Sequence, residues 1–310
     1  MPTNVDVLVS EVGPRDGLQS IKSIMPLAAK NEWISAEAAA GVREIEVGSF
    51  VSPKLLPQLA DTADVVAHAL SIPGLTVAVL VPNLKGAQAA VEAGAHKITL
   101  PFSASDTHLL KNVRRTPEQM LEETRAIVAL LRSLPGERRP KFEAGISTAF
   151  GCSYEGIVPE DKVVRLAETV MQAGCDEVGL SDSTGYANPA QVKSLVKRVR
   201  GAIGESAFAG LHLHNTRGLG LANVLAGLEL GVKTFDSSLA GLGGCPWAPG
   251  ASGNIVTEDL VFMLEAMGVH TGIDLNRLLG VRKILAASLP QESLYGFVPE
   301  AGLPLGFTPA

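Results

Sequence analysis

Two histidines separated by a single residue, His212 and His214, are the clearest indication of chemistry in this sequence. They end a run from Phe208 that favours a β-strand, and alternate residues of a strand point to the same side. The two imidazoles would therefore converge on one point, which is typical of a divalent-metal site. The alternative is a pair of histidines that are simply exposed where a strand ends. The spacing alone leaves both interpretations open.

Oxygen ligands that could complete such a metal site lie far away in the sequence. Asp16 follows the first predicted strand, and Asn254 ends a glycine-rich stretch. Mixed imidazole and oxygen ligands fit Mg²⁺, Mn²⁺, Zn²⁺ or Co²⁺, and the sequence does not choose among these metals. Arg15 precedes Asp16 and carries a permanent charge that can stabilise a developing enolate oxygen. An ordinary ion pair between Arg15 and Asp16 is the alternative.

The stretch from Gly241 to Asn254 has the composition of a functional loop. It contains five glycines and two prolines in fourteen residues, and long loops inside compact domains often act as lids. Such a lid would carry Cys245 to the reacting carbon, where the thiol would act either as a nucleophile or as a general acid. An ordinary long surface loop is the alternative. Of the three cysteines, Cys152 and Cys175 are predicted to be structural, and the odd number without a CxxC pair indicates a reducing compartment.

Further polar residues follow other predicted strands. Glu46 and Asp182 are candidates to orient Arg15 or the metal ligands, and a buried structural ion pair is the alternative for each. A basic cluster of Lys111, Arg114 and Arg115 would either meet phosphate groups or lie solvated at the start of a helix. The positions at strand ends also include Ser49, Asn83 and Lys85.

The elements that would bring these residues together repeat along the chain. Four times a helical segment ends near a glycine that is followed by a short β-rich run, at Gly41, Gly94, Gly174 and Gly231. Glycine adopts the left-handed conformation at a helix end at little cost. With four further β-rich runs this predicts eight strands, at residues 5–12, 42–47, 75–81, 95–100, 142–148, 175–180, 208–214 and 232–237.

The helix starts have signals of their own. Thr116 and Gln119 have the spacing of a capping box. Prolines, which are tolerated in the first turn of a helix, lie near four predicted starts, at Pro26, Pro117, Pro159 and Pro189.

Eight alternating βα units in 310 residues average roughly 39 residues each and predict parallel strands joined by right-handed crossovers. We therefore predict an α/β fold, a (β/α)8 TIM barrel, whose catalytic groups gather at the C-terminal ends of the strands. A doubly wound open sheet is the alternative, but the Gly13–Gly17 segment lacks the GxGxxG pattern of dinucleotide-binding sheets. The barrel is expected to span residues 1–290, with residues 291–310 as a short C-terminal tail.

Composition excludes several other classes of protein. The chain is 46% hydrophobic and 19% charged, which argues against disorder. No apolar run approaches the roughly 18 to 20 residues of a membrane-spanning helix. A net charge of −6 argues against a general nucleic-acid binder. The first predicted strand begins near Val5, which leaves no room for a targeting peptide, and we expect a cytoplasmic protein.

Five stretches of the sequence resemble the 3-hydroxy-3-methylglutaryl-CoA (HMG-CoA) lyases. The last of them, GLGGCPWAPGASGN, is close to a signature of these enzymes, and the resemblance covers residues 5–285. The stretches are Gly13–Gln19, Ser49–Lys54, Pro82–Gly86, Gly151–Gly156 and Ala240–Leu260.

The resemblance implies a barrel that binds a divalent metal, Mg²⁺ or Mn²⁺, and an acyl-CoA substrate. The implied reaction is the cleavage of (S)-3-hydroxy-3-methylglutaryl-CoA to acetyl-CoA and acetoacetate, as in leucine degradation and ketone-body metabolism. A homodimer is also implied. The implied metal ligands are Asp16, His212, His214 and Asn254.

The resemblance also implies roles for individual residues. Arg15 would stabilise the thioester enolate, Asp16 or His212 would accept the hydroxyl proton, and Cys245 would protonate the enolate. Supporting residues would be Glu46, Asp182 and Glu258. Substrate and CoA would contact Arg15, Ser49, Asn83 and Lys85.

The sequence departs from the family pattern beside the two histidines. Asn215 and Arg217 stand where the family usually has Asp and Tyr, and Ser181 and Ser183 flank Asp182 where it usually has Gly and Thr. Arg217 would face a differently placed substrate carboxylate or would pair with a neighbour. These changes keep open a lyase for a related branched 3-hydroxyacyl-CoA such as citramalyl-CoA. A condensing 2-oxo-acid acyltransferase and a non-enzymatic scaffold are two further hypotheses for the function.

Overall fold

The computed structural model describes residues 5–243 and 253–310. Within this part of the chain, eight parallel strands close into a barrel in chain order, and β8 pairs with β1. The strands are β1 (Leu8–Glu11), β2 (Glu44–Ser49), β3 (Thr76–Leu80), β4 (Lys97–Ser103), β5 (Lys141–Ser147), β6 (Glu177–Asp182), β7 (Phe208–Leu213) and β8 (Thr234–Ser237). The predicted (β/α)8 barrel is confirmed, with each strand within a few residues of its predicted place.

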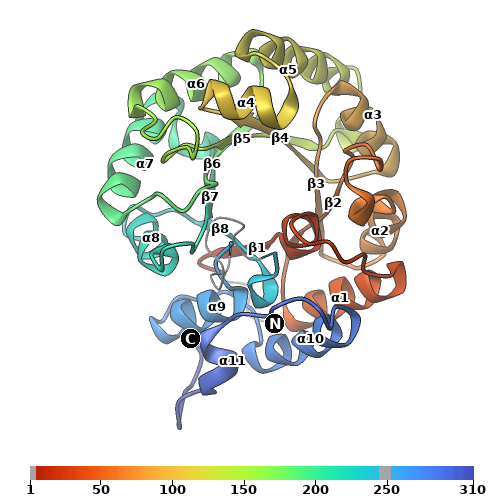
Figure 1. The fold of residues 1–310 in the computed structure, drawn as a ribbon, viewed down its shortest axis with the longest axis vertical. Coiled ribbons are helices and arrows are strands. Elements are labelled where there is room, and N and C mark those ends of the chain that lie inside the picture. Colours follow the sequence, from red (N-terminus) through yellow and green to blue (C-terminus); the bar gives the residue numbers. More distant parts are fainter. Residues whose placement is uncertain (1–4, 244–252) are drawn as a thin grey trace.

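Helices surround the barrel, as Figure 1 shows, and α10 lies beside α1. In the described residues they are α1 (Leu27–Ala40), α2 (Thr62–Leu70), α3 (Leu84–Ala93), α4 (Asp106–Val113), α5 (Pro117–Arg132), α6 (Glu160–Ala173), α7 (Pro189–Ile203), α8 (Gly220–Leu228), α9 (Thr257–Ala266), α10 (Leu275–Ser288) and α11 (Phe297–Ala301). Short helical turns include η1 (Gly13–Gly17) and η5 (Leu239–Gly241). Among these helices, none has both the length and the apolar character needed to cross a membrane.

The helix ends follow the local signals in the sequence. Gly41, Gly94 and Gly174 end α1, α3 and α6 with φ angles of 114°, 84° and 107°, which other residues adopt only with strain. The capping box at the start of α5 forms as predicted, because the Thr116 hydroxyl accepts from the Gln119 N–H and the Gln119 side chain accepts from the Thr116 N–H. Local chemistry therefore sets where these helices begin and end.

The lower part of the barrel interior is polar. Lys97 at the start of β4 lies 2.7 Å from Glu143, 3.3 Å from Glu177 and 3.5 Å from Glu44. Burial raises the pKa of Glu143 to about 7, although the positive charge of Lys97 opposes that shift. Barrels of this kind usually fill their interior with branched apolar side chains. Here an ion cluster takes that place.

A buried carboxyl group ties together the segments that follow β1 and β8. Glu11 ends β1, and its Oε1 atom accepts hydrogen bonds from the N–H groups of Gly13 at 2.7 Å and Leu239 at 2.9 Å. Its Oε2 atom accepts from the Thr257 hydroxyl at 2.6 Å. Glu11 thereby joins the start of η1, the start of η5 and the first turn of α9.

A second acidic residue, Glu37 of α1, is completely buried near Glu11. Neither of its carboxyl oxygens has a hydrogen-bond partner of ordinary geometry among the described residues. Burial, followed by the negative charge of Glu11, raises the pKa of Glu37 well above its ordinary value, and burial raises that of Glu11 to about 8. Glu37 therefore holds its proton to a higher pH in the folded protein than in the unfolded chain.

We expect Glu37→Gln to gain stability over the wild type as the pH rises from 5 to 8. In the unfolded chain Glu37 ionises near pH 4.5, so above that pH unfolding releases a proton that the folded state holds. The free energy of unfolding of the wild type then falls by about 1.4 kcal/mol for each pH unit up to the folded pKa. Glutamine does not titrate and escapes this loss. Urea unfolding at pH 5, 6, 7 and 8 measures the difference, with the exposed Glu32→Gln on the same helix as control. A difference that stays constant over this range would contradict the prediction.

The C-terminal residues pack against the barrel. The Asp259 carboxylate at the start of α9 accepts from the N–H groups of Phe297 at 2.9 Å and Val298 at 2.8 Å, at the start of α11. The Tyr295 N–H donates to the carbonyl of Ala240 at 2.7 Å. The helix α11 was not predicted from the sequence, and a boundary between barrel and tail at residue 290 stays a prediction.

Candidate active site

The first polar segment of the site is the η1 turn, which carries Arg15 and Asp16 directly after β1. A side chain at Gly13 would place its Cβ atom 2.5 Å from Glu11 Oε1, so the turn requires glycine there. The Asp16 N–H donates to the carbonyl of Val12 at 2.6 Å. This tight turn directs the Arg15 and Asp16 side chains to the C-terminal mouth of the barrel.

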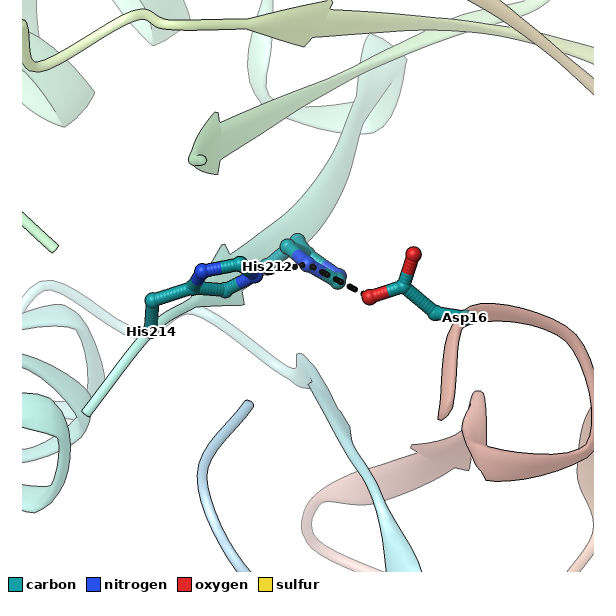
Figure 2. Close-up of side chains that lie close together, drawn as sticks. All are labelled: Asp16, His212 and His214. Carbon is teal, nitrogen blue, oxygen red and sulfur yellow. Dashed lines mark hydrogen bonds and ion pairs between the residues drawn. The ribbon is translucent and has the colours of Figure 1, made fainter. Parts of the chain in front are cut away.

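The structure brings Asp16, His212 and His214 to one point (Figure 2). The Nε2 atoms of the two histidines are 3.1 Å apart, and His212 Nε2 lies 3.8 Å from Asp16 Oδ2. One potential ligand atom from each residue lies within 4.8 Å of the others. The strand periodicity that motivated the metal hypothesis therefore results in a compact set of two nitrogens and one carboxylate.

Asn254 adds an oxygen to this set. Its Nδ2 atom donates to Asp16 Oδ2 at 2.7 Å, which brings the amide beside the three residues. Its Oδ1 atom is buried and has no hydrogen-bond partner among the described residues. A buried carbonyl oxygen without a donor is costly, and a bound cation would satisfy it. The donor set of two imidazoles, one carboxylate and one amide oxygen fits a divalent metal.

The electrostatics of the site favour Asp16 and His214 in their metal-binding forms. Burial opposes ionisation of Asp16, but the charge of Arg15 and the nearby His212 hold the pKa of Asp16 well below its ordinary value. Burial and the neighbouring His212 lower the pKa of His214 to about 3. Asp16 is thus an anion and His214 a neutral imidazole at physiological pH, as metal binding requires.

Arg15 is held between two carboxylates. Its Nε atom donates to Glu46 of β2 and its Nη1 atom donates to Asp16. The Arg15 side chain is only 11% exposed, so these contacts fix the direction of the guanidinium. Glu46 therefore lies where it can orient Arg15.

A cavity of about 720 Å³ opens over the metal ligands and is lined by Arg15, Asp16, His212 and His214. The same cavity extends down to Lys97 and outward to a rim that carries the basic cluster. Lys111 lies 3.8 Å from the centroid of the Tyr154 ring, and Arg115 forms an ion pair of 2.8 Å with Glu123. The cluster thus lies at the cavity and not only on a solvated helix start.

Three predicted substrate contacts lie to one side of this cavity. Ser49, Asn83 and Lys85 line a second cavity of about 560 Å³ beside α3, and of the three only Asn83 also lines the first cavity. Asn83 Oδ1 accepts from the Gly86 N–H at 3.0 Å, so this side chain caps α3. The structure does not bring Ser49 or Lys85 to the metal ligands.

Asp182 and Glu258 hold backbone near the site. The Asp182 carboxylate accepts from the N–H groups of Tyr186 at 2.8 Å and Ala187 at 3.1 Å, in the segment after β6. Glu258 accepts from the Ala240 N–H at 2.9 Å and forms an ion pair of 2.6 Å with Arg282. Cys245 lies outside the described residues.

Arg217 pairs with a neighbouring loop. Its Nη1 atom donates to the carbonyls of Thr184 and Gly185, both at 3.0 Å, and its guanidinium lies 4.6 Å from the centroid of the Tyr186 ring. Asn215 Oδ1 accepts from the Gly220 N–H at 3.0 Å at the start of α8. Of the two roles considered for Arg217, the structure supports pairing with a neighbour.

Asp236 of β8 belongs to the site but was not predicted from the sequence. Its Oδ2 atom lies 3.1 Å from His212 Nδ1, on the side of the imidazole opposite the metal-facing nitrogen. The strand register aligns His212 with Asp236. An acidic residue near the end of the predicted strand that follows the His-x-His strand in the chain was the available signal.

The barrel and its mouth together define a class of protein. The architecture is that of a metal-dependent enzyme built on a (β/α)8 barrel. The C-terminal ends of its strands carry an anionic Asp, two histidines and an Asn, and a fixed Arg lies beside them.

Comparison with known proteins places the chain in a family. The HMGL-like family profile matches residues 6–285, and the chain therefore belongs to the HMGL-like family. It is 41% identical to the mitochondrial hydroxymethylglutaryl-CoA lyase of Macaca fascicularis over 93% of this chain and 87% of that protein. It is 40% identical to the hydroxymethylglutaryl-CoA lyase YngG of Bacillus subtilis over 91% of this chain and 93% of that protein.

A solved structure extends the likeness to the whole chain. An HMG-CoA lyase from Acinetobacter baumannii, in complex with coenzyme A and 3-methylmalate, superposes with a TM-score of 0.90 at 42% identity and covers 100% of both chains. The predicted resemblance to the HMG-CoA lyases is confirmed.

Proposed function

We propose that this protein is a hydroxymethylglutaryl-CoA lyase, which cleaves (S)-3-hydroxy-3-methylglutaryl-CoA to acetyl-CoA and acetoacetate. The observation that carries the proposal is the convergence of Asp16, His212 and His214 with the unpartnered oxygen of Asn254, beside Arg15. Relatives that are carbon–carbon lyases of this kind, about 40% identical over 91–93% of the chain, support it.

The residues at the mouth have complementary tasks in that reaction. When bound by Asp16, His212, His214 and Asn254, a divalent cation, Mg²⁺ or Mn²⁺ in this proposal, would lower the pKa of the substrate C3 hydroxyl and orient it. Asp16 or His212 accepts the hydroxyl proton as the C2–C3 bond breaks. The electrons of that bond pass to the thioester, and the fixed guanidinium of Arg15 stabilises the enolate oxygen.

Cys245 is proposed to return a proton to the enolate carbon. We expect Cys245→Ala to retain its affinity for Mn²⁺ and to lose turnover by roughly 10²- to 10⁴-fold, the usual contribution of a general acid. Steady-state assay of reduced protein beside a Mn²⁺ titration measures both. Cys175→Ala is the matched control, because burial raises the pKa of the Cys175 thiol to about 12 and keeps it protonated. A fully active Cys245→Ala protein would rule out the proton-donor role.

An acyl-CoA brings several phosphate charges to the site. In the protein, which has a net charge of −6, the cavity rim carries Lys111, Arg114 and Arg115. Cationic side chains at the entrance are complementary to CoA phosphates, and they support an acyl-CoA substrate that enters between α4 and the segment after β2.

The decisive experiment measures acetyl-CoA release from a panel of 3-hydroxyacyl-CoAs by metal-replete, reduced protein, with Mg²⁺ and Mn²⁺ compared. The panel contains HMG-CoA, citramalyl-CoA and a longer 3-alkyl analogue. Turnover of HMG-CoA with the highest kcat/KM is the expected result. No turnover of HMG-CoA sinks the proposal, and condensation of acetyl-CoA with a 2-oxo acid in the absence of cleavage would favour an acyltransferase. A homodimer, a cytoplasmic location and a role in leucine degradation stay predictions.

A further inference from the structure

Asp236 on the inward face of β8 is an ionisable residue that the proposed chemistry leaves unused. Its side chain is 29% exposed and lines the cavity that also contains the Lys97 cluster. Among the described residues, its one ion-pair partner is His212. Lys97, which lies in the barrel interior, forms its ion pairs with Glu44, Glu143 and Glu177 and not with Asp236. A structural salt bridge therefore does not account for Asp236.

The contact with His212 has a direct consequence for the metal site. A carboxylate that accepts a hydrogen bond from Nδ1–H leaves the Nε2 lone pair free. His212 Nε2 is the atom that faces Asp16 at 3.8 Å and His214 Nε2 at 3.1 Å. Carboxylates that bind the second nitrogen of a metal-ligating histidine fix its ring orientation and strengthen it as a ligand.

The backbone makes this contact a fixed feature of the barrel. Strands β7 and β8 pair so that His212 aligns with Asp236. A Cβ atom at Gly210 of β7 would lie 2.6 Å from the carbonyl oxygen of Thr234, so the close approach of the two strands depends on glycine. The distance between His212 and Asp236 is thus set by the sheet.

We propose that Asp236 is a positioning residue for the reaction, which holds the His212 imidazole with its Nε2 lone pair directed at the metal. The inference rests on the proposed metal-dependent function of this site. It predicts that the loss of Asp236 weakens metal binding first and turnover as a consequence.

The test is Mn²⁺ binding, measured from the electron paramagnetic resonance signal of free Mn²⁺, in the wild type and in three variants. Asp236→Ala is expected to raise the Mn²⁺ dissociation constant by about 10- to 100-fold. Asp236→Asn is expected to raise it less, because the amide oxygen still accepts from Nδ1–H. Thr234→Ser is the matched control, since Thr234 lines the same cavity two residues earlier on the same strand, and it is expected to bind Mn²⁺ like the wild type.

A second readout separates positioning from a purely structural role. If Asp236 acts through the metal, saturating Mn²⁺ recovers much of the kcat of Asp236→Ala, whereas a damaged barrel does not respond to added metal. An unchanged dissociation constant in Asp236→Ala overturns the proposal. If that variant does not fold, Asp236→Asn decides the question. A Mn²⁺ dissociation constant equal to that of the wild type contradicts the proposal, and a several-fold increase supports it. Metal binding needs no substrate, so a failure of the lyase assay leaves this test intact.

Discussion

Arg15→Met is expected to lose turnover by about 10²- to 10³-fold, the usual effect of removing one preorganised donor to an oxyanion. Methionine approximates the length of the arginine stem but has no charge and no N–H donors. The enolate would then develop its negative charge in a cavity without the guanidinium that Glu46 and Asp16 hold in place. The loss should appear in kcat, because the enolate exists only after the substrate has bound.

Metal binding should survive this change. The charge of Arg15 helps to keep Asp16 ionised, and a bound divalent cation supplies that charge in its place. Removing Arg15 also removes a positive charge that repels the metal. We expect a Mn²⁺ dissociation constant within about threefold of the wild type, a difference below about 0.7 kcal/mol.

Arg15→Lys is the informative control, since it keeps the charge and loses the planar fork that reaches both carboxylates. It should recover part of the turnover that Arg15→Met loses. Steady-state kinetics with HMG-CoA, together with the Mn²⁺ titration, measure these effects. Turnover by Arg15→Met within tenfold of the wild type would show that the enolate is stabilised by another group.

Asp16→Ala is expected to have the largest effect of all, with loss of both metal and activity. Asp16 is the anionic member of the ligand set, and its Oδ2 atom also accepts the hydrogen bond from Asn254 at 2.7 Å. The substitution therefore removes one metal ligand and also removes the hydrogen-bond acceptor that holds a second ligand, Asn254, in place. Metal catalysis contributes several kcal/mol to the transition state, so turnover should fall by roughly 10³-fold or more.

The metal readouts separate this effect from misfolding. Dialysed Asp16→Ala protein should retain no stoichiometric metal in elemental analysis, and its melting temperature should not rise when Mn²⁺ is added. Without metal it should melt somewhat below the metal-free wild type, because it loses the ion pair with Arg15 and the hydrogen bond from Asn254, but it should still unfold in one cooperative transition. Asp16→Asn keeps the size of the side chain but not its charge, and it should bind Mn²⁺ only weakly. Tight metal binding by Asp16→Ala would remove Asp16 from the ligand set.

Much of the fold could be predicted because its signals are local. A glycine after a helix, a proline in a first turn and the Thr116–Gln119 box each act within a few residues, and the structure has them as expected. The signal for two of the metal-site residues was equally local, because alternate residues of a strand point to the same side and this alone makes His212 and His214 neighbours. The helix α11 was not foreseen because its start is held by Asp259, which is remote in the sequence.

The contacts that the sequence did not predict join residues far apart in the chain. Glu37 lies on α1, and its buried position beside Glu11 depends on how that helix packs over β1. Arg217 follows β7, yet its partners are backbone carbonyls after β6. Asp236 meets His212 only because of the register between β7 and β8. The alternation within each strand does not fix this register uniquely, since pairing shifted by two residues keeps every side chain on the same face.

The sequence by itself thus determined the barrel, the metal-binding residue types and the family to which they belong. The tertiary structure decided that Asp16 and Asn254 meet the two histidines, that Glu46 fixes Arg15, and that Ser49 and Lys85 lie in a neighbouring cavity. The formation of helices and strands depends on short-range periodicity and on turn chemistry, and a short segment of the sequence is enough to show both. The site depends on closure of the barrel, which alone brings residues from its first and last strands within bonding distance.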